Sequence, residues 1–292
     1  GLRTPEDRIY SSGEFFIPGQ RRGYRDAHRG GHGSVDLSAS IAESVNTYYY
    51  RLAMDLGIER FDAYMRRYGF GQPTGIDLVG EFAGILPSPA WKRQRFKMPW
   101  YTGETVIAGI GQGYWVVTPL QLAQGTASLA NGGNRIPLRL VSETRTGFNQ
   151  PWVPLPKPTA TSIGATAEQL QAIKTGMQAT MHTRRGTGWA IAAGSPYLMA
   201  GKTGTVQKIS RKGNLSLDPK NLPLHLRHQA LFIGYAPADD PKIAVVVVVE
   251  HGGYGATSAG PIARKMMDAY LLKPKAPLPQ PAAEPNPEAG HD

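Results

Sequence analysis

Two short polar motifs contain the residues of this chain whose types and spacing could do chemistry. The first, Lys202-Thr203-Gly204-Thr205, lies in a predicted strand over residues 197–207. A lysine there places positive charge in a cleft, and threonine hydroxyls can bind a carboxylate. The glycine leaves room for a peptide to lie along the strand and pair with it as an added strand. The amide of Thr205 can point at a developing oxyanion, so the motif indicates a site for a peptide that ends in a carboxylate.

The second motif, Ser44-Val45-Asn46, lies between two predicted helical segments far upstream. Ser-x-Asn is frequent by chance, and the alternative interpretation is a helix cap in which Ser44 or Asn46 starts the next helix. Lys-Thr-Gly-Thr alone is equally consistent with a chance tetrapeptide at a strand edge. Together, however, they match two of the three clusters of penicillin-reactive serine acyltransferases, which are Ser-x-x-Lys, Ser-x-Asn and Lys-Thr-Gly. No serine here has a lysine three positions later, so the nucleophile's cluster is absent from this sequence.

Two other patterns suggest chemistry less strongly. Gly109-Ile110-Gly111-Gln112-Gly113 lacks the lysine and the spacing of nucleotide-binding loops. We expect a tight loop packed near the site that leads into a helix at Thr118. Asp26, His28 and His32 form the only metal-like cluster, but their spacing is not that of a strong ligand set. We interpret these three as residues of a surface loop.

Composition limits the class of protein. The 292 residues allow one large domain or two small ones, and 41% hydrophobic residues allow a real core. The net charge of +10 favours anionic partners such as cell-wall polymer or a phospholipid surface. No zinc finger, recognition helix or RNA-binding signature is present, which argues against nucleic acid. We expect solvated faces or flexible loops for the two basic runs, which are Arg21, Arg22, Arg25 and Arg29, and Lys92, Arg93, Arg95 and Lys97.

The absence of cysteine excludes disulfides, thiol catalysis and thiolate metal sites, but it fits either redox compartment. No apolar run reaches the roughly 20 residues that span a bilayer, and no signal peptide opens the chain. Because Gly1 is not an initiator methionine, we expect the start to be a cut inside a longer protein. Residues 273–292 are rich in Pro, Ala and Glu, and we expect them to be a disordered tail.

The periodicity of hydrophobic residues and the positions of glycine and proline predict alternating loops, helices and strands. Residues 1–35 are expected to be loops with short strands, residues 70–100 a loop, and residues 145–163 a connector. The run of five valines over residues 245–249 is typical of a strand covered on both faces. We predict helices over 37–57 with a break near Ser44, over 59–67, from Thr118 to about Ala130, from Thr166 to about Met181, and over 259–272, and further strands over 230–235 and 243–250.

Longer stretches extend the match beyond the two motifs. The chain resembles the class B penicillin-binding transpeptidases of bacterial cell elongation, the penicillin-binding protein 2 family, over about residues 1–272. The most specific stretches are Gly111-Gln112-Gly113-Tyr114-Trp115 and Arg95-Phe96-Lys97-Met98-Pro99-Trp100-Tyr101. The others are Tyr24-Arg25-Asp26, Gly31-His32-Gly33, Glu43-Ser44-Val45-Asn46-Thr47-Tyr48-Tyr49-Tyr50, Tyr68-Gly69-Phe70-Gly71 and Thr74-Gly75-Ile76-Asp77-Leu78.

The resemblance implies an α+β fold of the penicillin-binding, β-lactamase-like type, an antiparallel sheet flanked by helices with Lys-Thr-Gly on the cleft edge. Residues 1–272 would form a partial transpeptidase domain. The Ser-x-x-Lys helix, the first strands of the sheet and a membrane anchor would all precede Gly1. Such a sheet exposes an edge, so we expect poor stability unless the missing part is supplied.

The resemblance also implies the reaction and the residue roles. The absent serine would attack the D-Ala-D-Ala bond of a cell-wall stem peptide, and Ser44, hydrogen-bonded to Lys202, would relay the proton to the leaving D-alanine. Asn46 would bind the donor amide, while Thr203, Gly204 and Thr205 would bind the substrate end. β-Lactams would stall at the acyl stage, no cofactor would take part, and this chain alone would not acylate. A membrane glycosyltransferase would be the partner, at the periplasmic face of the inner membrane.

One departure from the family concerns metal. Some members are thought to bind zinc through two Asp, a His and a Cys, and Asp26 and His32 match one Asp and the His. Ser11 and Val45 occupy the other two positions. We therefore predict no zinc.

Two other functions stay open. A non-catalytic scaffold or regulator would have lost the serine from the complete gene. A penicillin-hydrolysing enzyme would need a deacylating base, and the long separation of Ser44 from Lys202 argues against it.

Overall fold

The computed structural model describes residues 1–207 and 222–272. Within them, local side-chain signals mark where several helices start. Side chains of Asp36, Ser88, Thr118 and Thr166 accept from backbone N–H groups of the first turn of α1, α4, α6 and α7. The helices are α1 (Leu37–Ala42), α2 (Asn46–Leu56), α3 (Ile58–Arg67), α4 (Pro89–Phe96), α5 (Thr102–Ala108), α6 (Pro119–Ala130), α7 (Ala167–His182), α8 (Trp189–Ala192), a short 3-10 turn (Leu224–Leu226) and α9 (Ala259–Leu271).

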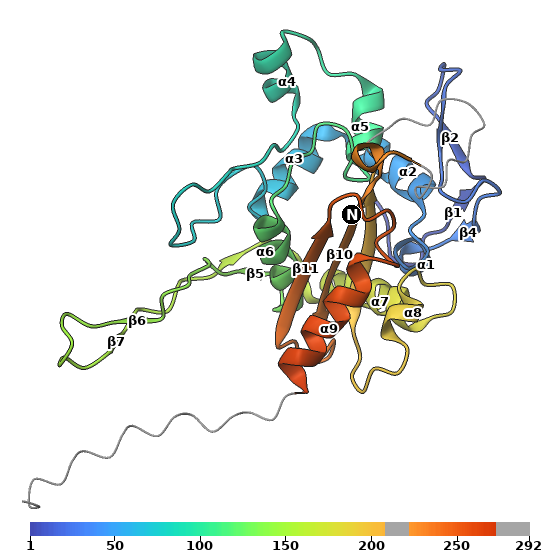
Figure 1. The fold of residues 1–292 in the computed structure, drawn as a ribbon. Coiled ribbons are helices and arrows are strands. Elements are labelled where there is room, and N and C mark those ends of the chain that lie inside the picture. Colours follow the sequence, from blue (N-terminus) through green and yellow to red (C-terminus); the bar gives the residue numbers. More distant parts are fainter. Residues whose placement is uncertain (208–221, 273–292) are drawn as a thin grey trace, which may run out of the picture.

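The central sheet is antiparallel, with the strand order β11-β10-β9 (Figure 1). Its strands are β9 (Ala200–Val206), β10 (Gln229–Ala236) and β11 (Ile243–Val249). In the register, Thr205 lies opposite Ala230, and Phe232 lies opposite Val247. The other strands form short antiparallel pairs, β1 (Ile9–Ser11) with β4 (Gly33–Val35), β2 (Glu14–Phe16) with β3 (Gly23–Arg25), β5 (Asn134–Arg135) with β8 (Thr161–Ser162), and β6 (Glu143–Thr144) with β7 (Val153–Pro154).

The core lies on both faces of the central sheet. Phe232 and Val247 belong to a buried cluster with Met267 of α9, whereas Tyr235 belongs to another with Met177 of α7. Successive side chains of a strand point to opposite faces, so the sheet packs between α9 and the layer that contains α6 and α7 (Figure 1). The predicted antiparallel sheet flanked by helices is therefore confirmed.

Most predicted elements are confirmed, and the differences have local causes. Helix α4 falls in the segment predicted to be loop, although Ser88 and Pro89 are a regular N-cap and N1 pair. The predicted full coverage of the valine strand is wrong at Val248, which is 38% exposed, while Val245 and Val247 are buried. The predicted tail 273–292 lies outside the described residues.

One basic residue predicted to be solvated is in fact buried. Lys92 is only 2% exposed, and its Nζ donates to Glu104 Oε1 at 2.5 Å and lies 4.2 Å from the centre of the Tyr101 ring. The ion pair joins α4 to α5, and an unpaired charge at this depth would be costly. The other members of both basic runs are exposed, as predicted.

Among the described residues, none of the helices has both the length and the hydropathy to cross a bilayer.

Candidate functional site

The fold brings the two motifs together. Lys202 Nζ donates to Ser44 Oγ at 2.8 Å, although the two residues are 158 positions apart, and it also donates to the Thr203 carbonyl at 2.8 Å. The sheet presents Lys202 on β9, and the break between α1 and α2 presents Ser44. The predicted juxtaposition of a hydroxyl and a lysine amine is thus present in the structure.

Ser44 has an unusual backbone conformation. Its φ is 59°, in the left-handed region that non-glycine residues seldom adopt. The cap of α2 is Val45 and makes no side-chain hydrogen bond, and Asn46 is the first helical residue. The alternative interpretation is therefore confirmed in that Asn46 starts α2, but neither Ser44 nor Asn46 is the cap residue. Such a conformation costs about 1–3 kcal/mol and persists only where its surroundings fix it.

The environment of Lys202 changes its acid–base behaviour. Burial disfavours the charged amine and lowers the pKa of Lys202 from 10.5 to about 8. The two acceptors, a hydroxyl and a carbonyl, carry no formal charge to offset this. Lys202 therefore exchanges its proton much closer to neutral pH than an exposed lysine does.

Thr203 is held by a residue that no sequence pattern indicated. Thr203 Oγ1 and Thr187 Oγ1 share a hydrogen bond of 2.7 Å, and the Thr187 backbone N–H donates to the Ala42 carbonyl at 3.0 Å. Thr187 lies in the turn between α7 and α8 and links β9 to the end of α1. A lone threonine in a turn has no sequence signature, so only the tertiary contact identifies it.

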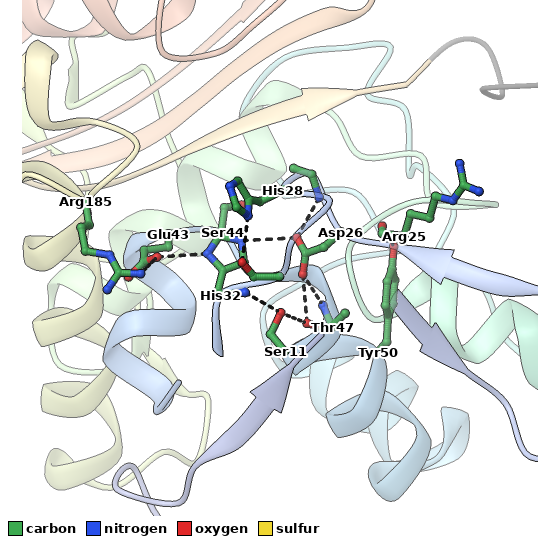
Figure 2. Close-up of polar contacts among 12 residues, drawn as sticks. Ser11, Arg25, Asp26, His28, His32, Glu43, Ser44, Thr47, Tyr50 and Arg185 are labelled. Atoms are coloured by element: carbon green, nitrogen blue, oxygen red, sulfur yellow. Dashed lines mark hydrogen bonds and ion pairs between the residues drawn. The ribbon is translucent and has the colours of Figure 1, made fainter. Parts of the chain in front are cut away.

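A polar network lies behind Ser44 (Figure 2). Glu43, the residue directly before Ser44, accepts from His32 Nδ1 at 3.0 Å and from Arg185 Nη2 at 2.8 Å. The Glu43 side chain is 10% exposed and the His32 side chain 12%, whereas Arg185 is largely solvated. The network therefore ties the residue before the left-handed Ser44 to two other parts of the chain.

The same network continues to Asp26 (Figure 2). Asp26 Oδ2 accepts from the backbone N–H and from Oγ1 of Thr47, each at 3.0 Å, and Thr47 Oγ1 lies 2.7 Å from Ser11 Oγ. Asp26 is 4% exposed, so its prediction as a surface loop residue is wrong. The prediction is also wrong for His32, whose Nε2 is buried 3.8 Å from Asp26 Oδ1, while His28 is exposed as predicted.

These residues do not fit a zinc site. The Val45 side chain is apolar, Ser11 supplies only a neutral hydroxyl, and Asp26 already accepts from Thr47 and from the Ala27 N–H. Structural zinc sites need four nitrogen, thiolate or carboxylate ligands. Within the described parts of the chain, no group of three or more His, Cys, Asp or Glu is placed to hold a metal ion.

The glycine-rich loop lies beside the site, as predicted. Gln112 Nε2 donates to the Thr205 carbonyl at 3.1 Å, which connects the loop after α5 to the end of β9. Trp115 stabilises the loop by donating its Nε1–H to the Ala108 carbonyl, at the end of α5, at 3.2 Å. The candidate site therefore has three sides, the Ser44 turn, the β9 edge and the Gln112 loop.

Comparison with known proteins identifies close relatives. The family model of the penicillin binding protein transpeptidase domain matches residues 5–268. The peptidoglycan D,D-transpeptidase MrdA of Haemophilus influenzae is 39% identical over 269 residues, which are 92% of this chain and 41% of that protein. This chain thus spans about two fifths of the length of that curated relative.

Solved structures agree with this match. The crystal structure of Pseudomonas aeruginosa PBP2 in complex with WCK 5153 superposes with a TM-score of 0.80 at 41% identity, covering 94% of this chain and 55% of that one. A structure titled for the coordination of polymerization and crosslinking by a peptidoglycan synthase complex superposes with a TM-score of 0.75 at 30% identity, covering 95% and 44%. The predicted fold class is therefore confirmed.

Proposed function

Because the chain belongs to the penicillin-binding protein transpeptidase domain family, we propose that it forms part of the acyl-transfer site of a peptidoglycan D,D-transpeptidase. The observation that carries the proposal is the hydrogen bond of 2.8 Å from Lys202 Nζ to Ser44 Oγ. Of the three clusters that this chemistry requires, this chain supplies Ser44 with Asn46, and Lys202 with Thr203, Gly204 and Thr205. The Ser-x-x-Lys cluster comes from outside this chain.

The first half of the reaction forms an acyl-enzyme. The nucleophilic serine attacks the carbonyl between two D-alanines, and its oxygen–carbon bond replaces the peptide carbon–nitrogen bond. The lysine of the Ser-x-x-Lys cluster takes the proton of the attacking serine, and Ser44 Oγ, hydrogen-bonded to Lys202 Nζ, relays that proton to the departing amine. The amide of Thr205 stabilises the oxyanion, Asn46 binds the donor amide, and Lys202 with the Thr203 and Thr205 hydroxyls binds the terminal carboxylate.

The second half resolves the acyl-enzyme. The amine of a neighbouring stem peptide attacks the ester carbon, so the cross-link forms and the serine hydroxyl is restored. A β-lactam mimics the donor, and its opened ring stays attached to the serine, which blocks this step. The substrates are therefore stem peptides, and β-lactams are the inhibitors of the same site.

The proposal also includes a partner and a location. The proposed partner is the membrane glycosyltransferase of the elongation complex, supported by the likeness to a chain of a peptidoglycan synthase complex that polymerizes and crosslinks. The proposed location is the periplasmic face of the inner membrane, where stem peptides are exposed. The basic net charge of +10 is compatible with an anionic cell-wall polymer.

The test is covalent labelling with a fluorescent penicillin, read by intact mass. This chain is compared with a version extended upstream through about a hundred further encoded residues. We expect an adduct on the extended version only. Absence of an adduct from both proteins, when both are folded, would favour a non-catalytic scaffold. An adduct on the short chain would show that it contains a nucleophile of its own.

A further inference from the structure

The outer edge of β9 is where a peptide could add to the sheet. Strand β10 pairs with one side of β9, and no other described strand pairs with it. In an antiparallel ladder, N–H and C=O groups of alternate residues point to opposite sides. The Thr205 carbonyl accepts from the Gln112 side chain, which belongs to a loop outside the sheet, so we infer that the groups of Thr203 and Thr205 face outward. A donor peptide that extends the sheet would therefore donate an N–H to one of these carbonyls.

Gln112 reaches this edge from a loop of defined geometry. Gly111 and Gly113, on either side of Gln112, have φ values of 73° and 81°, which favour glycine. The Gln112 backbone N–H donates to the Ile107 carbonyl at 3.2 Å. Trp115 packs edge-on against Phe61 and Phe70 with ring centroids 5.8 and 5.7 Å apart. The loop is thus anchored at both ends, and its glutamine is directed at β9.

We propose that Gln112 is a specificity-determining residue that competes with the substrate for the Thr205 carbonyl. Its Nε2–H occupies the acceptor that a donor peptide would use, so a substrate N–H must replace it or share the oxygen. The inference rests on the proposed function, because it requires that a peptide or a β-lactam amide pairs with β9. It extends that function by assigning a role to the Gly109–Gly113 loop.

The expected effect is small and chemically selective. Replacing one neutral hydrogen bond by another changes binding modestly, and the released Gln112 amide can bond to water because its side chain is only partly buried. A ligand without an N–H at this position gains nothing when Gln112 is removed. The effect of Gln112 on acylation should therefore depend on whether the ligand carries this N–H group. A Gln112 that only stabilised β9 would affect both kinds of ligand equally.

The experiment uses the upstream-extended protein and two ligands, benzylpenicillin and its analogue methylated on the side-chain amide nitrogen. The second-order acylation constant is measured for each ligand with the unsubstituted protein, Gln112→Ala and Gln112→Met. The methionine variant keeps the length of the side chain and removes only its polar groups. Gln150→Ala, in the exposed turn between β6 and β7, is the matched control.

We expect both Gln112 variants to raise the ratio of the benzylpenicillin constant to the analogue's constant by roughly threefold to tenfold, the range of one neutral hydrogen bond. Gln150→Ala should leave the ratio unchanged. An unchanged ratio in the Gln112 variants would overturn the inference, and a lowered ratio would too, because Gln112 would then assist the N–H ligand. If the unsubstituted extended protein reacts with neither ligand, the proposed function itself fails, and this inference fails with it.

Discussion

Lys202 and Ser44 form a hydrogen-bonded pair, and the titration of the Lys202 amine makes both substrate binding and stability depend on pH. With its pKa lowered to about 8 by burial, Lys202 is protonated below that value and neutral above it. Its proposed attraction for the substrate carboxylate is therefore present at neutral pH and lost as the pH rises. The free energy of unfolding changes with pH in the opposite direction. Because the folded pKa lies below the unfolded one, the folded state gains stability as the pH rises from about 8 towards 10.5.

The first prediction concerns the rate of acylation. In the upstream-extended protein, the second-order constant for a penicillin should fall above about pH 8, approaching tenfold per pH unit where Lys202 is neutral. Lys202→Arg should extend the plateau to higher pH, because a guanidinium keeps its charge, even if its maximum rate is lower. Stopped-flow acylation between pH 6.5 and 10 measures both. A flat profile for the unsubstituted protein would contradict a charge role for Lys202.

The second prediction concerns the network behind Ser44. Glu43→Ala removes the acceptor of His32 and Arg185 and should lower the free energy of unfolding by about 1–3 kcal/mol. Arg185→Ala removes a largely exposed partner and should cost less than about 1 kcal/mol. The neighbouring Arg184→Ala, at an exposed position, is the charge-matched control and should cost nothing measurable. Urea denaturation gives the three values, and equal costs for Glu43→Ala and Arg184→Ala would disprove the assignment.

At the scale of elements, two capping boxes of the same type differ in what else their glutamines contact. The side chains of Gln121 in α6 and Gln169 in α7 each accept from the backbone N–H of the cap residue, which is Thr118 or Thr166. The hydroxyl of that threonine accepts from the backbone N–H of the glutamine in return. Gln121 is also buried, and its Nε2 donates to the carbonyls of Gln72 and Ala83 at 2.8 and 2.9 Å. One glutamine therefore fixes the irregular chain before α4 onto α6, while the other acts only locally.

The third prediction follows from this contrast. Gln121→Ala leaves two carbonyls without their donor and should lower the free energy of unfolding by about 1–3 kcal/mol. Gln169→Ala removes an equivalent cap at an exposed position and should cost about 1 kcal/mol or less. Thermal or urea unfolding of the two variants side by side measures the difference. Equal destabilisation would mean that the bonds to Gln72 and Ala83 contribute nothing.

At the scale of the whole molecule, β11 is one of the two edge strands of the described sheet, and β9 is the other. Among the residues described, β11 pairs with β10 alone, so the other side of this valine-rich strand pairs with no described strand. Such edges associate with other strands unless they are charged or covered. The net charge of +10 opposes this association through repulsion between copies, and salt screens that repulsion.

The fourth prediction tests that edge in this chain by itself. Sedimentation velocity should show association that increases with protein concentration and with salt. Val248→Lys should reduce the association at little cost in stability, because Val248 is partly exposed. Val247→Lys, one residue earlier but buried, should instead unfold the protein, since it places an unpaired charge in the core. A chain that stays monomeric at every concentration and salt level would contradict the prediction.

The sequence by itself determined the two motifs, most helix boundaries and the central antiparallel strands. These depend on short-range chemistry, such as the Thr118 and Thr166 caps and the 2-residue side-chain alternation in strands, which neighbouring residues decide alone. The longer stretches that resemble the family predicted the fold, and the similarity to transpeptidase domains confirmed it. The catalytic and binding roles of Ser44, Asn46 and Lys202 remain predictions.

Only the tertiary structure decided what lies around those motifs. The burial of Asp26 and Lys92, the support of Thr203 by Thr187 and the contact from Gln112 to Thr205 all join residues distant in sequence. A charged or polar residue looks the same in a sequence whether water or a buried partner satisfies it. Its partner is selected by packing over the whole chain, because burying a polar group is tolerated only where the fold supplies a matching donor or acceptor.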